Sequence, residues 1–287
     1  LDEVARLVGA VPLCVGYVDE NQDRPGKPLR NSAAWLSGGR IVARFHKTLL
    51  PTYDVFDEAR YFEPASSVTP IRFGEFSFGV TICEDIWNDQ DFWSERQYRR
   101  DPVKELIAQG ADFIVNLSAS PWWLGKEKTR AAMLQRVACD ERVPLVYANL
   151  VGGNDELIFD GHSVALNRAG EVLALGKGFA EDVFVTEVDG DPAPISCAWP
   201  LAEENLFRAL SLGIRDYVGK CGFKSVVLGL SGGIDSALTA VLAVDALGAD
   251  KVMGVSMPAR YSSSGSLTDA ESLAKNLGIR YEVIPIE

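Results

Sequence analysis

The sequence predicts an α/β protein built from two layered units, and three observations support this prediction. Strand-like and helix-like segments alternate along most of the 287 residues, with tight turns between paired strands. Proline and glycine gather in residues 189–202, which is typical of a linker. A chain of this length also exceeds the usual size of a single hydrophobic core. We therefore expect units over residues 1–188 and 203–287, joined by residues 189–202.

Composition narrows the class of protein. With 47% hydrophobic and 24% charged residues and no low-complexity tract, the chain can bury a core and should be globular. A formal net charge of -12 argues against nucleic acid or an anionic membrane as partner. No run approaches the roughly 20 apolar residues of a membrane span, and the first residues do not show the positively charged start and apolar core that would predict a signal segment. These features favour a small-molecule enzyme.

The cysteines predict a cytoplasmic location. They are odd in number and widely scattered, without the CxxC spacing of a zinc site. Neither a disulfide framework nor a structural zinc is expected, and a reducing cytoplasm fits this pattern. The five positions are Cys14, Cys83, Cys139, Cys197 and Cys221.

The predicted elements of the first unit follow from apolar periodicity and turn residues. Ser37, Gly38 and Gly39 supply a tight hairpin turn. Asp101 and Pro102 can begin a helix that Gly110 ends. We expect helices at 2–8, 101–108 and 126–141, strands at 11–18, 78–82, 113–116 and 144–150, and hairpin arms at 33–36 with 40–46 and 163–166 with 172–175.

The predicted second unit is one half of a doubly wound parallel sheet. Helix 203–218 precedes strand 225–230, and alternation continues to the last residues. In such sheets, ligands bind at the carboxyl ends of the strands. The remaining expected elements are a loop at 231–235, helices at 236–247 and 267–277, and strands at 252–257 and 281–285.

The loop after strand 225–230 has the composition of a phosphate site. Adjacent Gly232 and Gly233 let the backbone approach a polyphosphate, Ser231 and Ser236 can donate hydroxyl hydrogen bonds, and the next helix presents free amides. Asp235 beside phosphate is reasonable if Mg²⁺ lies between them. The ordinary alternative is a strand-turn-helix connection with Asp235 as helix cap. Walker and Rossmann patterns do not match.

This loop resembles the Ser-Gly-Gly-x-Asp-Ser motif of the PP-loop ATP pyrophosphatases. The resemblance implies ATP and Mg²⁺ as cofactors, with adenylation of a substrate and release of pyrophosphate. The implied metal ligand is Asp235. The implied ATP-binding residues are Gly229, Leu230, Ser231, Gly232, Gly233, Ile234, Asp235 and Ser236.

Cys83 is the candidate nucleophile. It ends a buried strand and precedes Glu84 and Asp85, although an isolated cysteine is often a small core residue. If Lys47 lies beside Cys83, its charge favours thiolate over thiol and stabilises the oxyanion formed when a carboxamide is attacked. A serine hydrolase is not supported, because no Gly-x-Ser-x-Gly turn occurs. His46 and His162 fall in strand-like stretches and are expected to be structural.

Four motifs resemble the nitrilase superfamily, particularly the glutaminase domain of bacterial NAD synthetases. The resemblance runs over nearly the whole chain and implies an α-β-β-α sandwich with a Glu-Lys-Cys triad. Cys83 would be the nucleophile and Lys47 the oxyanion-stabilising lysine. The general-base Glu is expected before Leu1, and Glu58 resembles a supporting glutamate. The motifs are Lys47-x-Leu-Leu-Pro, Cys83-Glu-Asp, 116–121 (Asn-Leu-Ser-Ala-Ser-Pro) and 151–157 (Val-Gly-Gly-Asn-Asp-Glu-Leu).

Three further residues match glutamine-contacting positions of that family: Tyr53, Ser120 and Lys126. Their phenol, hydroxyl and ammonium groups suit the polar end of an amino acid. Without the resemblance, the ordinary interpretations are favoured: a half-buried packing residue, a turn hydroxyl and a solvated charge at a helix start. Asn154 stands where the family pattern has Gln, which weakens any detailed role for its loop.

The resemblance implies a glutamine-hydrolysing ligase that uses glutamine, ATP and deamido-NAD and that forms a homo-oligomer. Both ends of the sequence look cut, and the deamido-NAD pocket is expected beyond Glu287. Three alternatives stay open: a stand-alone carbon-nitrogen hydrolase with a degenerate tail, a noncatalytic scaffold or ammonia-channel subunit, and another PP-loop amidotransferase.

Overall fold

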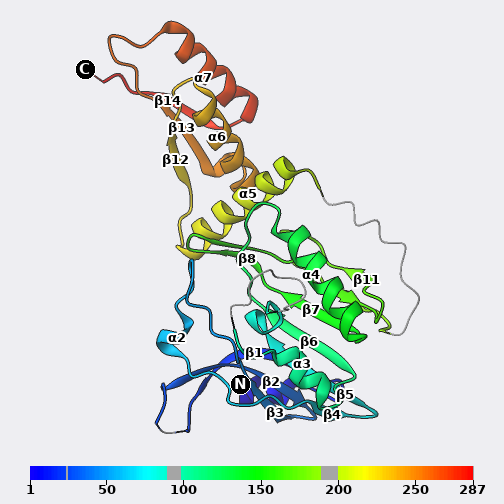
Figure 1. Ribbon diagram of the computed structural model, residues 1–287. Helices are drawn as coiled ribbons and strands as arrows, with labels where there is room; N and C mark the ends of the chain where they lie inside the picture. The colour runs from blue at the N-terminus through cyan, green and yellow to red at the C-terminus, as the bar shows by residue number, and fades with distance from the viewer. Residues whose placement is uncertain (24, 89–97, 189–199, 287) are drawn as a thin grey trace. The chain divides into compact units, whose positions relative to one another are not determined.

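A computed structural model shows two compact units, each with its own sheets and core (Figure 1). Two short segments from the middle of the sequence group with the C-terminal residues. The first unit falls within Leu1–Ser120, Gly125–Leu150 and Gly161–Ala198, and the second within Pro121–Leu124, Val151–Asp160 and Trp199–Glu287. The structure describes residues 1–23, 25–88, 98–188 and 200–286.

The first unit contains every strand and helix predicted for it, with ends shifted by at most a few residues. The sequence did not predict α2 or β4. The elements are α1 (Asp2–Leu7), β1 (Leu13–Glu20), β2 (Leu29–Ser37), β3 (Arg40–His46), α2 (Glu58–Tyr61), β4 (Ile71–Phe73), β5 (Phe76–Ile82), the 3-10 helix η1 (Cys83–Ile86), α3 (Pro102–Ala108), β6 (Phe113–Ser118), α4 (Lys126–Glu141), β7 (Leu145–Asn149), β10 (Val164–Leu166) and β11 (Val172–Leu175).

Two sheets form the centre of this unit. β1, β2 and β3 make an antiparallel sheet in that order. The second sheet has the order β11-β10-β7-β6-β5-β4, and its central strands β5, β6 and β7 are parallel. The carboxyl ends of these three strands therefore lie at one edge, which is where ligand sites of parallel sheets are usually found.

Packing against the sheets produces four layers. Leu106 of α3 and Leu134 of α4 pack with Ile114 on one face of the six-stranded sheet, where Figure 1 shows both helices. Its other face packs against β2, whose residues alternate between two cores because side chains of a strand point to opposite faces. Ala33 and Trp35 meet Val80 and Ile82 of β5, while Ala34 and Leu36 meet α1. The α-β-β-α sandwich is thus confirmed.

The second unit contains a parallel sheet in the order β12-β13-β14. Small residues let the helices approach it: Ala240 of α6 and Ala274 of α7 are buried with Leu230 and Val252 in one core. The predicted parallel half-sheet is confirmed. The elements are β8 (Val151–Asn154), β9 (Leu157–Asp160), α5 (Ala202–Lys220), β12 (Val226–Gly229), α6 (Ile234–Leu247), the 3-10 helix η2 (Ala249–Lys251), β13 (Val252–Ser256), α7 (Ser264–Leu277) and β14 (Arg280–Val283).

Three sequence expectations need correction or fall outside the structure. Helix α6 begins at Ile234 rather than at 236, because Gly233 is its N-cap and the helical turn includes Asp235. His162 lies outside the strands, with a left-handed φ of 50°, whereas His46 ends β3 as expected. Cys197 and most of the predicted linker, residues 189–199, lie outside the described residues.

Helix length and polarity were also compared with the requirements of a bilayer. Among the described helices, none combines the length and apolar character needed to cross a membrane.

Candidate active site

Cys83 stands on a sharp turn at the carboxyl end of a central strand. β5 ends at Ile82, and Cys83 begins η1 with a φ of 44°. A left-handed φ is uncommon for a residue with a Cβ and is frequent where a functional group must be held in one orientation. Because β6 is parallel to β5 and Ile82 pairs with Leu117, Ser118 of the neighbouring strand follows beside the half-buried cysteine.

Asp85 joins this turn to the segment that carries the candidate lysine. Its Oδ1 accepts the backbone amides of Thr48 and Leu49 at 3.0 and 2.8 Å, and its Oδ2 accepts the amide of Ile82 at 3.0 Å. Burial raises the pKa of Asp85 to about 6, although these three N–H donors favour the charged form. One buried carboxyl therefore fixes the lysine segment and the cysteine turn against each other.

Lys47 is fully buried and has a charge partner. Its Nζ donates to Oε1 of Glu58 at 2.6 Å, and only 1% of its side chain is exposed. Asn31 donates from Nδ2 to Oε2 of the same glutamate at 3.3 Å. A buried ammonium is costly unless it is paired, and Glu58 at the start of α2 supplies that partner and holds the side chain in place.

The protonation state of Cys83 differs from the sequence expectation. The charge of Lys47 lowers the thiol pKa, as expected, but burial outweighs it and raises the pKa overall. Glu84 and Glu58 raise it further. At neutral pH the group is therefore a thiol rather than a thiolate. Attack on a carbonyl consequently needs a base that removes the proton as the bond forms.

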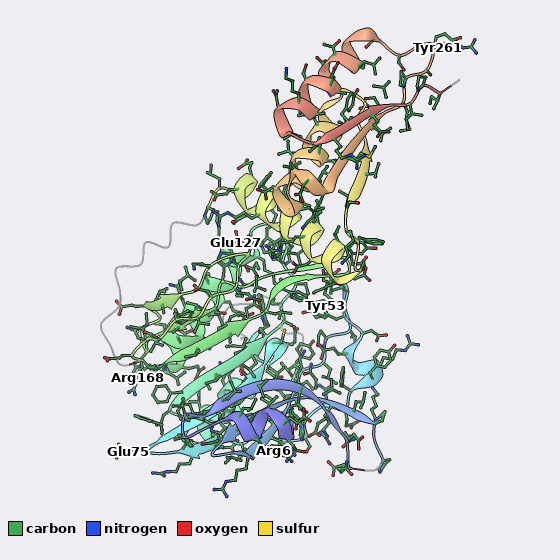
Figure 2. All side chains as sticks on the ribbon, turned by 180° about the vertical axis from the view of Figure 1, so that it is seen from behind. Arg6, Tyr53, Glu75, Glu127, Arg168 and Tyr261 are labelled. Atoms are coloured by element: carbon green, nitrogen blue, oxygen red, sulfur yellow. The ribbon has the colours of Figure 1, made fainter. Side chains whose placement is uncertain are left out.

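Glu84 holds two phenols at the site. Its Oε1 accepts a hydrogen bond from the Tyr53 hydroxyl at 2.7 Å and another from the Tyr98 hydroxyl at 3.2 Å. Burial, followed by the carboxylate, raises the pKa of both tyrosines. Tyr53, labelled in Figure 2, lies on the segment that follows β3. The Glu84 carboxylate and the two phenol hydroxyls that donate to it therefore form a polar group of side chains beside Cys83.

Ser120 is placed by the neighbouring parallel strands. It lies two residues beyond β6 and is 2% exposed. Its amide donates to Oδ1 of Asn149, the last residue of β7, at 3.2 Å. Asn149 in turn donates from Nδ2 to the carbonyl of Gly161 at 2.8 Å. Next to them, Cys83 Sγ lies 4.0 Å from the carbonyl of Ala119. The structure thus brings Ser120 to the same strand edge as the thiol.

Lys126 is not a solvated charge. It is the first residue of α4, is half-buried, and its ammonium lies 5.2 Å from the centroid of the Trp87 ring. Trp87 directly follows η1, the turn that begins with Cys83. The Lys126 ammonium therefore makes a cation–π contact with the residue that follows the cysteine turn. Such a contact stabilises a partly desolvated charge.

The predicted phosphate loop, residues 231–236, connects β12 to α6. Its two hydroxyls contact each other, with Ser231 Oγ 3.0 Å from Ser236 Oγ. The amide of Gly233 donates to Ser231 Oγ at 3.2 Å. Gly232 has a φ of 78°, and a Cβ there would lie 2.3 Å from the carbonyl oxygen of Ser266. Only glycine fits this position, for reasons of both conformation and space.

The N terminus of α6 is open to an anion. Its N-cap residue, Gly233, has no side chain to bond the free amides, and Asp235 does not cap the helix as the ordinary interpretation required. The Asp235 side chain is exposed and, within the described part of the chain, makes no hydrogen bond or ion pair. Leu230 is buried, and its carbonyl accepts the Ser256 hydroxyl at 2.7 Å.

The residues around Asp235 offer few ligands for a magnesium ion. In the described ranges, no group of three or more His, Cys, Asp or Glu side chains is arranged to hold a metal ion. Asp235 alone fits only a cation whose other ligands are phosphate oxygens and water, which is how Mg²⁺ commonly binds with nucleotides.

Sequence reasoning missed the residues that hold the site together. It named Glu84 and Asp85 only as neighbours of Cys83, and it did not find Asn149 or Tyr98. The signal in Cys-Glu-Asp is local, whereas two of the three amides that Asp85 binds, those of Thr48 and Leu49, are more than 30 residues away in sequence. Such a partnership becomes visible only after the strands are in register.

A strand-end cysteine beside a buried, paired lysine, in an α-β-β-α sandwich, defines a class of thiol-dependent enzymes that act on carbon-nitrogen bonds. The sequence model of the carbon-nitrogen hydrolase family matches residues 9–193, well over half of the chain. The chain therefore belongs to the carbon-nitrogen hydrolase family. The NAD synthase family model matches residues 206–287, which contain the predicted phosphate loop.

Relatives with both regions extend the comparison. The chain is 45% identical over 289 residues to a glutamine-dependent NAD(+) synthetase of Synechocystis sp., covering 98% of this chain and 52% of that protein. It is 39% identical to the glutamine-dependent NAD(+) synthetase of Thermotoga maritima, covering 96% and 52%. The chain thus resembles these synthetases over nearly its whole length and spans about half the length of the curated relatives it matches.

Solved structures agree with the fold. A glutamine-dependent NAD+ synthetase from Acinetobacter baumannii, in complex with ADP, has a TM-score of 0.87 and 35% identity, covering 99% of this chain and 52% of that one. A carbon-nitrogen hydrolase from Helicobacter pylori has a TM-score of 0.52 at 20% identity and covers 63% of this chain and 62% of its own. The latter likeness concerns the fold alone.

Proposed function

We propose that this chain carries the glutaminase part, and the first portion of the ATP-dependent part, of a glutamine-hydrolysing NAD(+) synthase. The observation that supports this most strongly is the Asp85 carboxyl, which accepts amides from both the Lys47 segment and the Cys83 turn. This arrangement preorganises a nucleophile and an oxyanion-stabilising cation, and the same chain carries a phosphate loop. Relatives that match nearly the whole chain are named glutamine-dependent NAD(+) synthetases.

The first reaction is hydrolysis of the glutamine side-chain amide. Cys83 Sγ attacks the carbonyl carbon while its proton passes to a base, and the resulting oxyanion is stabilised by Lys47 and the backbone amide that follows Cys83. The C–N bond then breaks, ammonia leaves, and water hydrolyses the thioester to glutamate. Glu58 is already bound by Lys47 and Asn31, so we assign it to holding the lysine and not to the proton transfer.

We assign binding of the α-amino and α-carboxylate groups of glutamine to polar side chains near the thiol. Tyr53 is oriented by Glu84, Ser120 lies at the neighbouring strand edge, and Lys126 supplies a cation for the substrate carboxylate. A negatively charged Glu84 suits a substrate ammonium for the same electrostatic reason. The contacts that support these assignments are those of the Tyr53 hydroxyl, the Ser120 backbone amide and the Lys126 ammonium.

The second reaction is ATP-dependent amidation of deamido-NAD. Residues 229–236 are assigned to ATP, with the amides at the start of α6 and the hydroxyls of Ser231 and Ser236 facing the polyphosphate. A carboxylate oxygen of deamido-NAD attacks the α-phosphorus and pyrophosphate leaves, after which ammonia displaces AMP. Mg²⁺, held by Asp235 and phosphate oxygens, would neutralise charge on the leaving group.

Several predictions from sequence extend this proposal. We assign glutamine hydrolysis to residues 1–188 and ATP-dependent amidation to residues 203–287, with residues 189–202 as the linker between them. Ammonia transfer between them, assembly into a homo-oligomer and a cytoplasmic location are implied by the resemblance to the synthetase family.

Covalent labelling tests the glutaminase assignment. The chain is treated with 6-diazo-5-oxo-L-norleucine, an electrophilic glutamine analogue, and the adduct is located by mass spectrometry. We expect one adduct at Cys83 that glutamine competes away and that Cys83→Ala removes. Cys139→Ala, at an exposed cysteine, is the matched control and should retain it. Labelling at Cys139 alone, or none at Cys83, would contradict the proposal and favour a noncatalytic scaffold.

Nucleotide binding tests the second part separately. A fluorescent ATP analogue with Mg²⁺ should bind the chain, and the double variant Asp235→Ala, Ser236→Ala should weaken binding at least tenfold. The control is Thr239→Ala, because the Thr239 hydroxyl donates to the backbone carbonyl of Asp235 and is not among the residues assigned to ATP. Unchanged binding by the double variant would instead favour a stand-alone hydrolase with a degenerate tail.

A further inference from the structure

The residue that leads into the predicted phosphate loop, Leu230, is held by three consecutive residues of β13. Its side chain fills the space beside Gly254, where an added Cβ would lie 2.4 Å from Leu230 Cδ1. Its amide donates to the carbonyl of Val255 at 2.8 Å. Its carbonyl accepts the hydroxyl of Ser256 at 2.7 Å. The side chain and both backbone polar groups of Leu230 are therefore fixed on one neighbouring strand.

A tyrosine of the third strand directs the Ser256 hydroxyl. Tyr281 of β14 pairs with Gly254, which lies two residues before Ser256 in β13, so Tyr281 and Ser256 share one face of the sheet. The Tyr281 hydroxyl donates to Ser256 Oγ at 2.8 Å. Because a serine hydroxyl has a single hydrogen, Ser256 accepts from Tyr281 and gives its own hydrogen to the Leu230 carbonyl. We call Tyr281 and Ser256 the hydroxyl chain.

The hydroxyl chain is built into the interior of the second unit. Only 3% of Ser256 is exposed, as is 3% of Leu230, and Tyr281 is half-buried. Hydrogen bonds in such a chain polarise one another, and a low local dielectric strengthens them further. A buried carbonyl that loses its donor is costly, so the Ser256 hydroxyl has a defined effect on Leu230.

The peptide group between Leu230 and Ser231 is held at both ends. Its carbonyl oxygen accepts the Ser256 hydroxyl, and its N–H, which belongs to Ser231, donates to Ser236 Oγ at 3.2 Å. A peptide group is planar, so fixing its oxygen and its hydrogen sets the direction in which the chain enters the loop. Ser231 and residues 233–235 are exposed. The hydroxyl chain is therefore a buried support at the entry of an exposed loop.

We propose that Ser256 is a positioning residue for the nucleotide site, with Tyr281 orienting its hydroxyl. The inference rests on the proposed function for the identity of the ligand, whereas the fixing of the peptide group does not. While the bond to Leu230 is present, the Ser231 and Ser236 hydroxyls are held in place before a nucleotide arrives, and less order has to be created on binding. Without it, affinity falls although every residue assigned to ATP is still present.

The affinity of the full chain for a fluorescent ATP analogue with Mg²⁺ tests this proposal. Ser256→Ala should weaken binding by about fivefold, roughly the factor of one net hydrogen bond. Tyr281→Phe leaves the bond from Ser256 to Leu230 in place and removes only the donor that orients it, so a smaller loss of about twofold is expected.

A double variant separates the hydroxyl chain from a general loss of packing. If Tyr281 acts through Ser256, Tyr281→Phe should weaken binding no further in the Ser256→Ala protein, because its acceptor is already absent. The matched control is Ser211→Ala. Ser211 is also buried in this unit, but its hydroxyl has no hydrogen-bond partner among the described residues, so nucleotide affinity should stay at the wild-type value.

Hydrogen exchange of the Ser231 amide, followed by NMR without nucleotide, gives a second readout. This amide should exchange faster in Ser256→Ala than in the wild type or in Ser211→Ala. The inference is overturned by unchanged affinity in Ser256→Ala, by equal losses in Ser256→Ala and Ser211→Ala, by additive effects in the double variant, or by unchanged Ser231 exchange. If the wild-type chain itself does not bind the analogue, the proposed nucleotide site fails instead, and Ser231 exchange still decides whether Ser256 fixes the peptide group.

Discussion

The cysteine turn and the phosphate loop are both strand-to-helix turns at the ends of parallel strands, but they are held in opposite ways. At the cysteine turn, the buried carboxyl of Asp85 binds three backbone amides. At the phosphate loop, exposed serine hydroxyls bond to each other, and the first amides of α6 have no capping side chain. The cysteine turn is held by one buried carboxyl, whereas the other turn is held by exposed hydroxyls and leaves the start of α6 without a capping side chain.

This difference follows from the chemistry that each turn is proposed to support. A thiol that attacks a neutral amide needs donors and a cation fixed before charge develops, because reorganisation during the reaction would raise the barrier. A nucleotide arrives fully charged and can satisfy the open amides itself. We therefore expect substitutions at the cysteine turn to reduce stability as well as reactivity, and substitutions at the phosphate loop to act mainly on binding.

The largest effect is expected from Asp85→Ala. The substitution leaves the buried amides of Thr48, Leu49 and Ile82 without their acceptor, and each such loss costs about 1–3 kcal/mol. We expect the free energy of unfolding to fall by about 3 kcal/mol or more, together with loss of analogue labelling at Cys83. Urea unfolding measures the first effect and mass spectrometry the second.

Asp112→Ala is the matched control for this prediction. Asp112 also accepts a backbone amide, that of Ser77 at 2.8 Å, but it is exposed, so water replaces the lost partner. A loss below about 1 kcal/mol is expected there. If the free energy of unfolding fell equally in the two variants, the three buried hydrogen bonds of Asp85 would stabilise the protein no more than the exposed one of Asp112.

The next effect concerns Gly232→Ala in the phosphate loop. An added Cβ would be strained at a φ of 78° and would also collide with the Ser266 carbonyl. Nucleotide binding, measured by fluorescence with an ATP analogue, should weaken more than tenfold, a loss above about 1.4 kcal/mol. Gly222→Ala is the matched control because Gly222 has a φ of 75° and nothing within 4 Å of an added Cβ. If both variants lost nucleotide affinity to a similar extent, backbone strain alone would explain the effect, and the collision with Ser266 would contribute nothing.

The same comparison shows which features are readable from sequence. Apolar periodicity and cap residues predicted helix 126–141 with both ends correct, and Asp101 does cap the preceding helix, α3, by accepting the Lys104 amide. Local signals suffice where neighbours in sequence are neighbours in space. The β8–β9 hairpin was missed because Gly152 and Gly153 have low strand propensity, and the pairing is stabilised by packing on a helix some 60 residues away.

The site residues also divide into those with a local sequence signal and those whose role depends on distant packing. Cys83 and Lys47 could be proposed from residue type and motif, and Ser231 to Ser236 from composition and place. The sequence could not show that Asp85 joins the lysine segment to the cysteine turn, since both carboxylates after Cys83 are equally plausible partners. Nor could it show that burial outweighs Lys47 in setting the thiol pKa, because burial is a property of the packed sheets.

The pH dependence of Cys83 alkylation tests how burial and Lys47 together set the thiol pKa. Because burial raises the Cys83 pKa, its reaction with iodoacetamide should still increase with pH above about 8.5, where an ordinary cysteine is half ionised. Lys47 lowers this pKa, so Lys47→Met should shift the profile to higher pH and slow alkylation at pH 8 by about fivefold. Exposed Cys139 is the internal control for reagent reactivity. A profile at lower pH in Lys47→Met would contradict the assigned charge of the lysine.

The smallest effect is expected from Tyr98→Phe, which tests how far internal bonding extends from the cysteine turn. Glu84 loses a 3.2 Å hydrogen bond but keeps the shorter one from Tyr53, so about threefold slower labelling by the glutamine analogue is expected. Tyr53→Phe should act more strongly because it also removes a proposed substrate contact. If Tyr98→Phe were the more damaging variant, Glu84 rather than Tyr53 would be the group that meets the substrate, and the phenol of Tyr53 would serve only to orient it.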